Sequence, residues 1–146
     1  MGGAGSMAAG QPYPENVQRL QPLRILLSGR DRRFIRVTSF LLSRRGYDVA
    51  HAEPGDVADA AERRRADVVL LETYGARGSA ARVLAALQAL ALPPGVLVVC
   101  DQDEGSRWDG VRSVEKWTPV ERLVSEIEAA SLGRRMPMLE MKGERP

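Results

Sequence analysis

Residues 67–72 limit the possible folds of this chain most strongly, because four consecutive aliphatic residues lie there between two carboxylates, Asp67 and Glu72. A strand with one solvent face alternates apolar and polar residues, so this unbroken run predicts a strand buried on both faces. Such a strand lies inside a parallel sheet covered by helices. Glu72 then stands at its carboxyl end, the edge where open parallel sheets usually hold their ligand or reacting groups. The role of Glu72 at that edge is therefore the main functional question.

Four more segments predict the other strands. Residues 24–28 form a short apolar run and are expected to be the first strand, and the continuous apolar run at 96–100 predicts another interior strand. Residues 47–52 alternate apolar residues with charged or polar ones, as expected of a strand near the sheet edge. Residues 111–116 alternate more weakly and are expected to form the last strand.

Helical periodicity occupies the segments between these strands. Apolar residues recur on one face of segment 32–45, which Gly46 is expected to end, and shorter patterns occur at 56–65 and 80–90. Ser79 is expected to cap the third of these helices, because a serine oxygen accepts a hydrogen bond from the first turn. The side chains expected to face the sheet are Phe34, Val37, Leu41 and Leu42, then Val57, Ala60 and Ala61, then Val83, Leu84, Leu87 and Leu90.

The last helix has the clearest local start signal in the chain. Thr118, Pro119 and Glu121 have the pattern of a capping box, with Thr as the cap, Pro at the first helical position and Glu at the third. The helix is expected to continue to about residue 131, and Gly133 is expected to end it. Its inward side chains are expected to be Leu123, Val124 and Ile127.

The order of these segments predicts the fold class. Strands joined by helices of this length form a parallel α/β sheet with right-handed crossovers and helices on both faces. We predict a five-stranded, doubly wound (βα)5 fold in which the polar segment 101–110 leaves the fourth helix short or absent. The domain is expected to span 23–132, between a flexible leader at 1–22 and a flexible tail at 133–146.

Composition excludes several classes of protein. The chain has 146 residues and a net charge of +2, so it lacks the one-signed surface typical of a dedicated nucleic-acid binder. A single cysteine, Cys100, excludes an internal disulfide, and no apolar run approaches the roughly 20 residues of a membrane span. The N-terminus lacks the basic and apolar regions of a secretory signal. We therefore expect a cytoplasmic protein that does not contact the membrane.

The common catalytic and cofactor-binding motifs do not occur in the sequence. No Gly-x-Gly-x-x-Gly follows the first strand, and no Gly-Lys-Ser/Thr loop is present to hold phosphate. The single histidine, His51, is expected on an edge strand without a nucleophilic serine nearby. Cys100 ends a buried strand and is expected to be a small core residue. The acidic residues at 101, 103 and 104 lack the spacing of a calcium loop. The sequence thus predicts no enzyme, no metal site and no cofactor.

Four stretches of the sequence together have the pattern of a known family. They are Arg-Ile-Leu-Leu at 24–27, Arg-Arg-Gly-Tyr-Asp-Val at 44–49, Ala-Glu-Pro-Gly-Asp-Val-Ala-Asp-Ala at 52–60, and Ala-Asp-Val-Val-Leu-Leu-Glu at 66–72. With this pattern the chain resembles, from residue 23 to about 132, the CheY-like receiver domain of bacterial response regulators. The resemblance implies a flavodoxin-like fold and a role in two-component signal transduction.

The resemblance also assigns roles to five positions at the carboxyl ends of the strands. The family's two acidic Mg²⁺ ligands fall on Gly29 and Arg30, and its phosphate-accepting aspartate falls on Glu72. The family's Thr or Ser at the end of the fourth strand is Cys100 here, whereas its lysine after the fifth strand is retained as Lys116. Lys116 is therefore the one family residue kept at these five positions.

These departures predict a site that does not take up phosphate. Mg²⁺ requires octahedral oxygen ligands, and Arg30 would place a cation where the metal binds. Glu72 is one methylene longer than aspartate and would misplace an acyl phosphate relative to Lys116. We expect the Glu72 carboxylate to lie between Arg30 and Lys116 in a permanent ion cluster. The alternative is that these three residues are unconnected at the ends of their strands.

Two further positions depart from the family's pattern. Ser113 stands where an aromatic switch residue is usual, and Trp117 replaces the proline that normally follows the lysine in a cis bond. The leading hypothesis is a non-enzymatic pseudo-receiver that binds a protein partner without phosphorylation. An aromatic residue is a common interface anchor. The expected partner surface consists of Trp108, Trp117, Val120 and Val124.

Two alternatives of other classes remain open, together with the state of assembly. The first is a divergent receiver that still takes up phosphate. The second is nucleic-acid binding, which the nearly balanced charge disfavours, through Arg30, Arg32, Arg33 and Arg36. A homodimer is compatible with any of these hypotheses.

Overall fold

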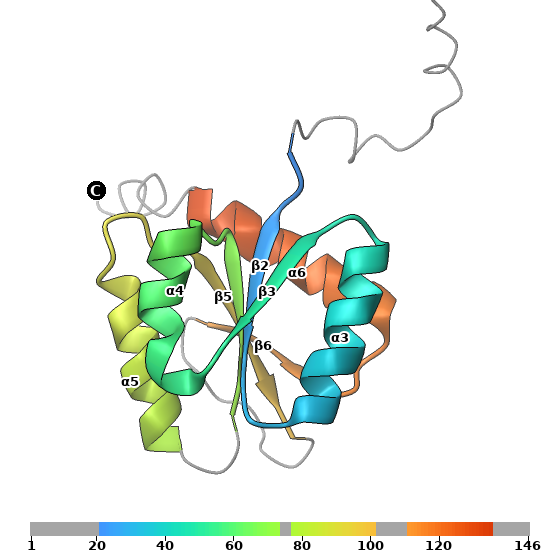
Figure 1. Ribbon diagram of the computed structural model, residues 1–146, viewed down its shortest axis with the longest axis horizontal. Helices are drawn as coiled ribbons and strands as arrows, with labels where there is room; N and C mark the ends of the chain where they lie inside the picture. Colours follow the sequence, from blue (N-terminus) through green and yellow to red (C-terminus); the bar gives the residue numbers. More distant parts are fainter. Residues whose placement is uncertain (1–20, 74–76, 102–110, 136–146) are drawn as a thin grey trace, which may run out of the picture.

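A parallel sheet forms the centre of the computed structural model, which describes residues 21–73, 77–101 and 111–135. Its strands are β2 (Arg24–Ser28), β3 (Asp48–Ala52), β4 (Val68–Glu72), β5 (Gly95–Cys100) and β6 (Arg112–Glu115). They are ordered β3-β2-β4-β5-β6, and each neighbouring pair is parallel (Figure 1). The predicted five-stranded parallel sheet is confirmed.

β4 is the central strand, as predicted from its unbroken apolar run. It lies between β2 and β5, and all five of its residues are buried. β3 lies at the sheet edge, and its pattern of exposed and half-buried residues explains why its sequence alternates. At the end of β4, Glu72 is in register with Val99 of β5, so its side chain starts from inside the sheet.

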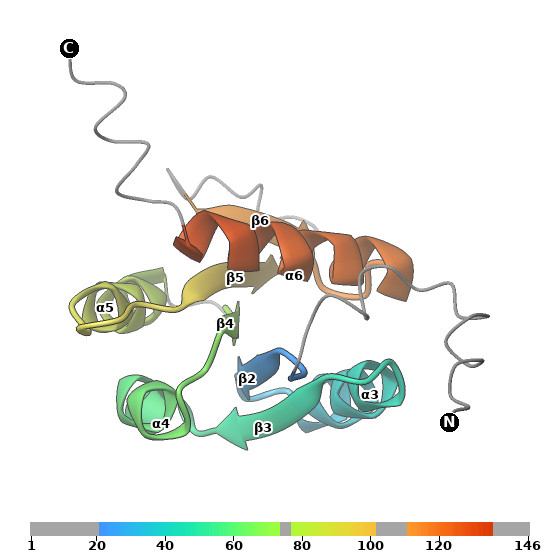
Figure 2. The same ribbon diagram turned by 90° about the horizontal axis from the view of Figure 1, so that it is seen from above.

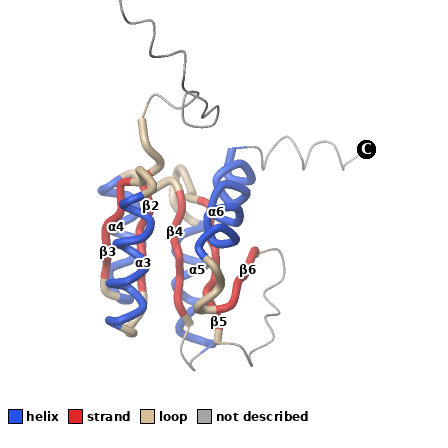
Figure 3. Tube along the Cα trace, turned by 90° about the vertical axis from the view of Figure 1, so that its right-hand side faces the viewer, coloured by secondary structure: helices blue, strands red, loops and turns tan. Residues whose placement is uncertain are grey.

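Four α-helices cover the two faces of the sheet within the described residues. They are α3 (Arg32–Arg44), α4 (Val57–Arg64), α5 (Arg77–Gln88) and α6 (Val120–Arg135), and a short 3-10 turn η1 (Pro54–Asp56) precedes α4. Seen from above, α3 and α6 lie on one face of the sheet and α4 and α5 on the other (Figure 2). Figure 3 shows the same strands and helices from the side. This doubly wound arrangement agrees with the predicted fold class. The fourth helix, predicted to be short or absent, would fall at 102–110, outside the described residues.

The interior strands supply a separate core to each face. On β2, Ile25 and Leu27 pack in the cluster with α3 and α6, whereas Leu26 packs in the cluster with α4 and α5. β4 alternates in the same way, with Leu70 facing α3 and α6 and Val69 facing the other pair. Burying each of these large aliphatic side chains contributes about 1.5–3 kcal/mol to folding.

The buried face of α3 differs from the predicted one. Its buried residues are Phe34, Thr38 and Leu42, whereas Val37 is 36% exposed and Leu41 is 37% exposed. The helix carries apolar residues on two adjacent faces, and its inward stripe includes a threonine, which a search for apolar residues passes over. The predicted inward positions of Val37 and Leu41 were therefore wrong, and those of Phe34 and Leu42 are confirmed.

The predicted limits of α5 need correction. The helix begins at Arg77, so Ser79 lies inside its first turn and cannot be its cap. Leu87 is fully buried, and Val83 and Leu90 are half-buried and pack against the core on this face, as predicted. Leu84 is half-buried, and Leu90 lies beyond the end of the helix at Gln88.

The predicted start of α6 is close to the observed one, but its end and its cap differ. The Pro119 carbonyl accepts the first helical hydrogen bond from Leu123, as expected of a helix that starts here. The Thr118 N–H donates to the Glu115 carbonyl, and the Glu121 carboxylate lies 3.5 Å from Arg45, so the reciprocal half of the capping box does not form. The helix continues to Arg135, past Gly133.

Glycine ends α3 as predicted, for a conformational reason. Gly46 has a φ of 95°, in the left-handed region that a residue without a Cβ adopts at little cost. Gly133 is not among the described residues with positive φ, which fits its position within α6.

The two faces of α3 give a matched test of this packing. Leu42→Ala should lower the free energy of unfolding by about 2–5 kcal/mol, because Leu42 is fully buried and its loss leaves a cavity. Leu41→Ala should change it by less than about 1 kcal/mol, because Leu41 already contacts solvent. Urea unfolding measures both values. Equal losses for the two variants would show that the helix is rotated from the position described.

Candidate functional site

A cluster of charged groups lies at the carboxyl edge of the sheet. Lys116 follows β6, Glu72 ends β4, and Asp31 lies between β2 and α3. The Lys116 Nζ lies 2.6 Å from Glu72 Oε2 and 2.8 Å from Asp31 Oδ2. The Glu72 side chain is only 2% exposed, so this ion pair is largely shielded from water. One ammonium therefore joins two carboxylates from different parts of the chain.

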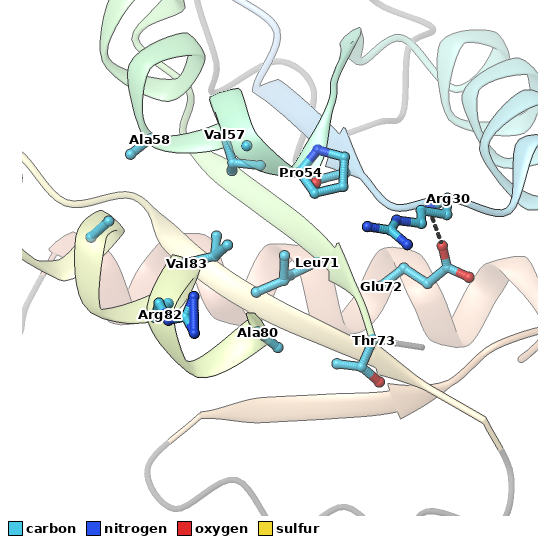
Figure 4. Close-up of a pocket in the computed structure, with 13 residues that line it drawn as sticks. Arg30, Pro54, Val57, Ala58, Leu71, Glu72, Thr73, Ala80, Arg82 and Val83 are labelled. Atoms are coloured by element: carbon cyan, nitrogen blue, oxygen red, sulfur yellow. Dashed lines mark hydrogen bonds between the residues drawn. The ribbon is translucent and has the colours of Figure 1, made fainter. Parts of the chain in front are cut away.

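The second oxygen of Glu72 binds the loop after β2. Its Oε1 accepts a hydrogen bond from the backbone N–H of Arg30 at 3.0 Å (Figure 4) and another from that of Asp31 at 3.1 Å. The neighbouring residue must be small: a Cβ added to Gly29 would collide with the Glu72 Oε1 and would lie 2.7 Å from the Glu72 Cβ and 3.0 Å from its Cδ. The long glutamate side chain thus occupies the space that any side chain at position 29 would need.

Asp31 has two roles in this arrangement. It is the N-cap of α3, where its Oδ1 accepts a hydrogen bond from the Phe34 N–H at 3.1 Å. Its other oxygen pairs with Lys116. The hydrogen bond from Lys116, together with that from the Phe34 N–H, lowers the pKa of Asp31 below its ordinary value of 3.8.

Lys116 is subject to opposing effects. Its partial burial disfavours the charged ammonium and would lower its pKa. The hydrogen bonds to Asp31 and Glu72 and the negative charges of both carboxylates outweigh this effect and raise the Lys116 pKa above its ordinary value of 10.5. Lys116 is thus held in its charged form at neutral pH.

The structure brings together some of the predicted site residues and adds one. Glu72 and Lys116 are in contact, but Arg30 reaches Glu72 through its backbone N–H, and no ion pair joins the two side chains in the described part of the chain. Arg30 is exposed. Asp31 supplies the second charged partner of Lys116, and the sequence prediction missed it. An aspartate directly before a helix is itself a signal for a cap, which would have marked this residue.

The other two predicted site positions, Cys100 and Ser113, lie on the neighbouring strands β5 and β6. Cys100 is buried at the end of β5, and its carbonyl accepts a hydrogen bond from the Lys116 N–H. Ser113 is half-buried on β6, in register with Val98.

The predicted partner surface is partly exposed. Trp117 is 54% exposed, stacks edge-on against Phe34 with ring centroids 5.4 Å apart, and lies 5.8 Å below the Arg33 guanidinium. Val120 is half-buried, and Val124 packs against the core of the α3 and α6 face. Trp108 lies outside the described residues. Trp117 is therefore the described residue of this surface that a partner can reach most easily.

Comparisons with solved structures identify the fold. The chain is similar to a signal receiver domain from Vibrio parahaemolyticus, with a TM-score of 0.66 and 19% identity over 82% of this chain and 97% of that one. It is also similar to a CheY-like receiver domain from Methylobacillus flagellatus, with a TM-score of 0.65 and 14% identity over 75% of this chain and 99% of that one. A CheY-like receiver domain from Methanospirillum hungatei gives a TM-score of 0.64 and 17% identity over 80% of this chain and 99% of that one. The chain has the receiver-domain fold. At these identities the likeness establishes the fold alone.

Sequence comparisons add no closer relationship, since no family model and no curated protein sequence matches the chain. Within the described residues, no helix combines the length and the apolar character needed to cross a membrane.

The receiver fold implies a magnesium ion at this edge, and the residues here do not fit one. Mg²⁺ needs several oxygen ligands in octahedral geometry. Asp31 and Glu72 are the carboxylates of the cluster, and the Lys116 ammonium lies between them, where a second cation would be repelled. Gly29 offers no side chain, and among the described residues no three His, Cys, Asp or Glu side chains are grouped as metal ligands.

The pH dependence of stability tests the cluster. Because folding lowers the pKa of Asp31, this carboxylate stabilises the folded state above pH 3.8. That stabilisation is lost as the pH falls through the lower pKa that Asp31 has in the folded protein. Because folding raises the pKa of Lys116, this ammonium stabilises the folded state below pH 10.5. That stabilisation is lost as the pH rises through the higher pKa that Lys116 has in the folded protein.

Lys116→Met removes the ammonium and keeps a side chain of similar length. It should lower the free energy of unfolding at pH 7 by about 1–3 kcal/mol, because two carboxylates lose their partner. It should also flatten the loss of stability at both ends of the pH range. Urea unfolding of both proteins from pH 3 to 11 measures this, and parallel pH profiles would contradict the proposed pairing.

Proposed function

We propose that residues 23–132 form a phosphorylation-independent receiver module that binds a protein partner in bacterial signal transduction or regulation. The observation that carries this proposal is the position of Glu72, whose carboxylate is held by Lys116 and by two backbone N–H groups. Receiver folds generally serve in signal transduction, which supports the broader part of the proposal, a role in signalling or regulation. On this proposal the protein is cytoplasmic and is not an enzyme.

The contacts of Glu72 leave it poorly suited to accept phosphate. Both of its oxygens are already engaged, and its side chain is almost fully buried. A phosphoryl group would have to displace Lys116 or the loop after β2. Without a metal to balance its charge, the added phosphate would lie beside the Asp31 carboxylate. The cluster therefore supports a fixed state of the domain over one that is switched by phosphorylation.

An exposed apolar surface supports the protein-binding part of the proposal. Phe40 is 59% exposed on α3, and Val37 and Leu41 are partly exposed beside it. These residues and Trp117, which we call the α3 surface, lie on or against the same helix. Aromatic residues and arginine are enriched at protein interfaces, and α3 carries Arg33 and Arg44 next to the exposed rings.

The first test concerns phosphate uptake. Incubation of the protein with acetyl phosphate and millimolar Mg²⁺ should leave its intact mass unchanged, because Glu72 is already paired and the metal lacks ligands. A receiver domain with the usual acidic residues, treated in parallel, is the positive control. A gain of one phosphoryl group that Glu72→Gln abolishes would favour the alternative of a divergent, phosphorylated receiver.

The second test concerns the α3 surface. Trp117→Ala and Phe40→Ala should each remove a specific set of proteins captured from the native cell, with little loss of stability because both side chains are more than half exposed. Leu92→Ala is the matched control, since Leu92 is 76% exposed and follows α5 on the other side of the sheet. Quantitative mass spectrometry compares the captured proteins. Identical sets from all variants would show that this surface does not bind the partner.

A further inference from the structure

A cavity of about 440 Å³ lies between α4 and α5 near the carboxyl edge of the sheet. This volume is within the roughly 300–1,000 Å³ range of small-molecule sites. Figure 4 shows Val57 and Pro54 facing Leu71 and Val83 across it, with Arg30 and Glu72 at one end. The cavity is on the opposite face of the sheet from α3 and α6, and so apart from the α3 surface.

The sequence explains why this space is open. Three of the six residues with which α4 and α5 line this cavity are alanines: Ala58, Ala80 and Ala86. Leu87 of α5 is fully buried in the core of the same face, and it is not among the residues that line the cavity. The alanines therefore leave a space with apolar walls that no described side chain fills.

A buried hydroxyl group marks the floor of the cavity. Ser28 is 1% exposed, lines the cavity, and its Oγ has no hydrogen-bond partner in the described part of the protein. Alternation along β2 places it on the same face as Leu26, toward α4 and α5. Buried polar groups normally have a partner, and those without one call for an explanation such as a bound molecule. Ser28 is thus a donor available to a ligand.

The charges around the cavity favour an anion. Arg30 and Arg82 both line it, and Glu72 is the one acidic residue among the described lining residues. The negative charge of Glu72 is partly offset by Lys116, which Glu72 shares with Asp31, and by the two backbone N–H groups that bind its other oxygen. The remaining lining charges are positive, and the first turn of α5 adds the positive end of a helix dipole through Ala80.

We propose that this cavity binds a small organic carboxylate with a compact apolar body. The body lies between the walls that α4 and α5 form, and the carboxylate accepts hydrogen bonds from Ser28 and from Arg82. Inorganic phosphate lacks the apolar part, and a neutral amide of the same shape lacks the charge. This inference goes beyond the proposed function and does not depend on it.

Three probes separate the parts of the proposal. 2-Naphthoate should cause saturable amide shifts in an NMR titration of the full chain, centred on Leu71, Val57 and Val83. 2-Naphthamide and inorganic phosphate should each bind at least about tenfold more weakly, since each lacks one of the two recognised features. Equal binding of the amide would overturn the role of charge, and equal binding of phosphate would overturn the apolar site. An absence of saturable shifts with all three probes would overturn the proposal.

Variants locate the binding site independently of the fold. Ser28→Ala should weaken 2-naphthoate binding about two- to tenfold while the melting temperature stays equal or rises, because the hydroxyl has no partner in the protein. Arg82→Gln should weaken binding by about tenfold. Arg122→Gln is the matched control, because this exposed arginine lies on α6, across the sheet.

A variant that fills the cavity tests the same site by blocking it. Ala58→Leu should abolish the titration shifts by occupying the cavity, with a melting temperature no lower than that of the parent protein. Unchanged affinity in both Ser28→Ala and Ala58→Leu, with both proteins folded, would show that the probe binds elsewhere and would overturn the assignment.

Discussion

The ion pairs of Lys116 connect parts of the fold that the sheet alone does not. Asp31 caps α3, Glu72 ends the central strand, and Lys116 follows the edge strand β6, so one ammonium joins three elements at one edge. Partly buried ion pairs add little net stability, because desolvation offsets much of the attraction, but removing one partner is costly. The cluster therefore fixes how these elements meet more than it stabilises the fold, which Leu70, Leu97 and Ile127 stabilise from within the core.

Two departures from the receiver pattern are physically linked in this arrangement. Gly29 leaves the space that the longer side chain of Glu72 fills, and a Cβ at position 29 would collide with that side chain. The extra methylene also lets the Glu72 carboxylate reach the N–H groups of Arg30 and Asp31. A change at either position alone would leave a clash or a gap. The glycine and the glutamate are thus parts of one packing solution.

The sequence predicts the sheet well because strand burial depends on local pattern. The unbroken apolar runs of β4 and β5 fit few structures other than a buried strand. In contrast, α3 carries apolar residues on two faces, and its pattern alone does not show whether Leu41 or Leu42 is buried. The ion cluster is harder to predict, because it depends on how the segments after β2, β4 and β6 place their side chains relative to one another. Residue type suggests that Arg30 is the partner of Glu72, yet the turn presents its backbone N–H there and leaves Asp31 facing Lys116.

The two faces of the sheet are packed differently, and Glu72 lies where they meet. The face of α3 and α6 is filled by large side chains such as Phe34 and Ile127, while that of α4 and α5 contains many alanines and keeps an open cavity. Arg30 and Glu72 line this cavity and also hold the loop that leads to Asp31. A molecule bound in the cavity would therefore contact the same two residues that fix the start of α3.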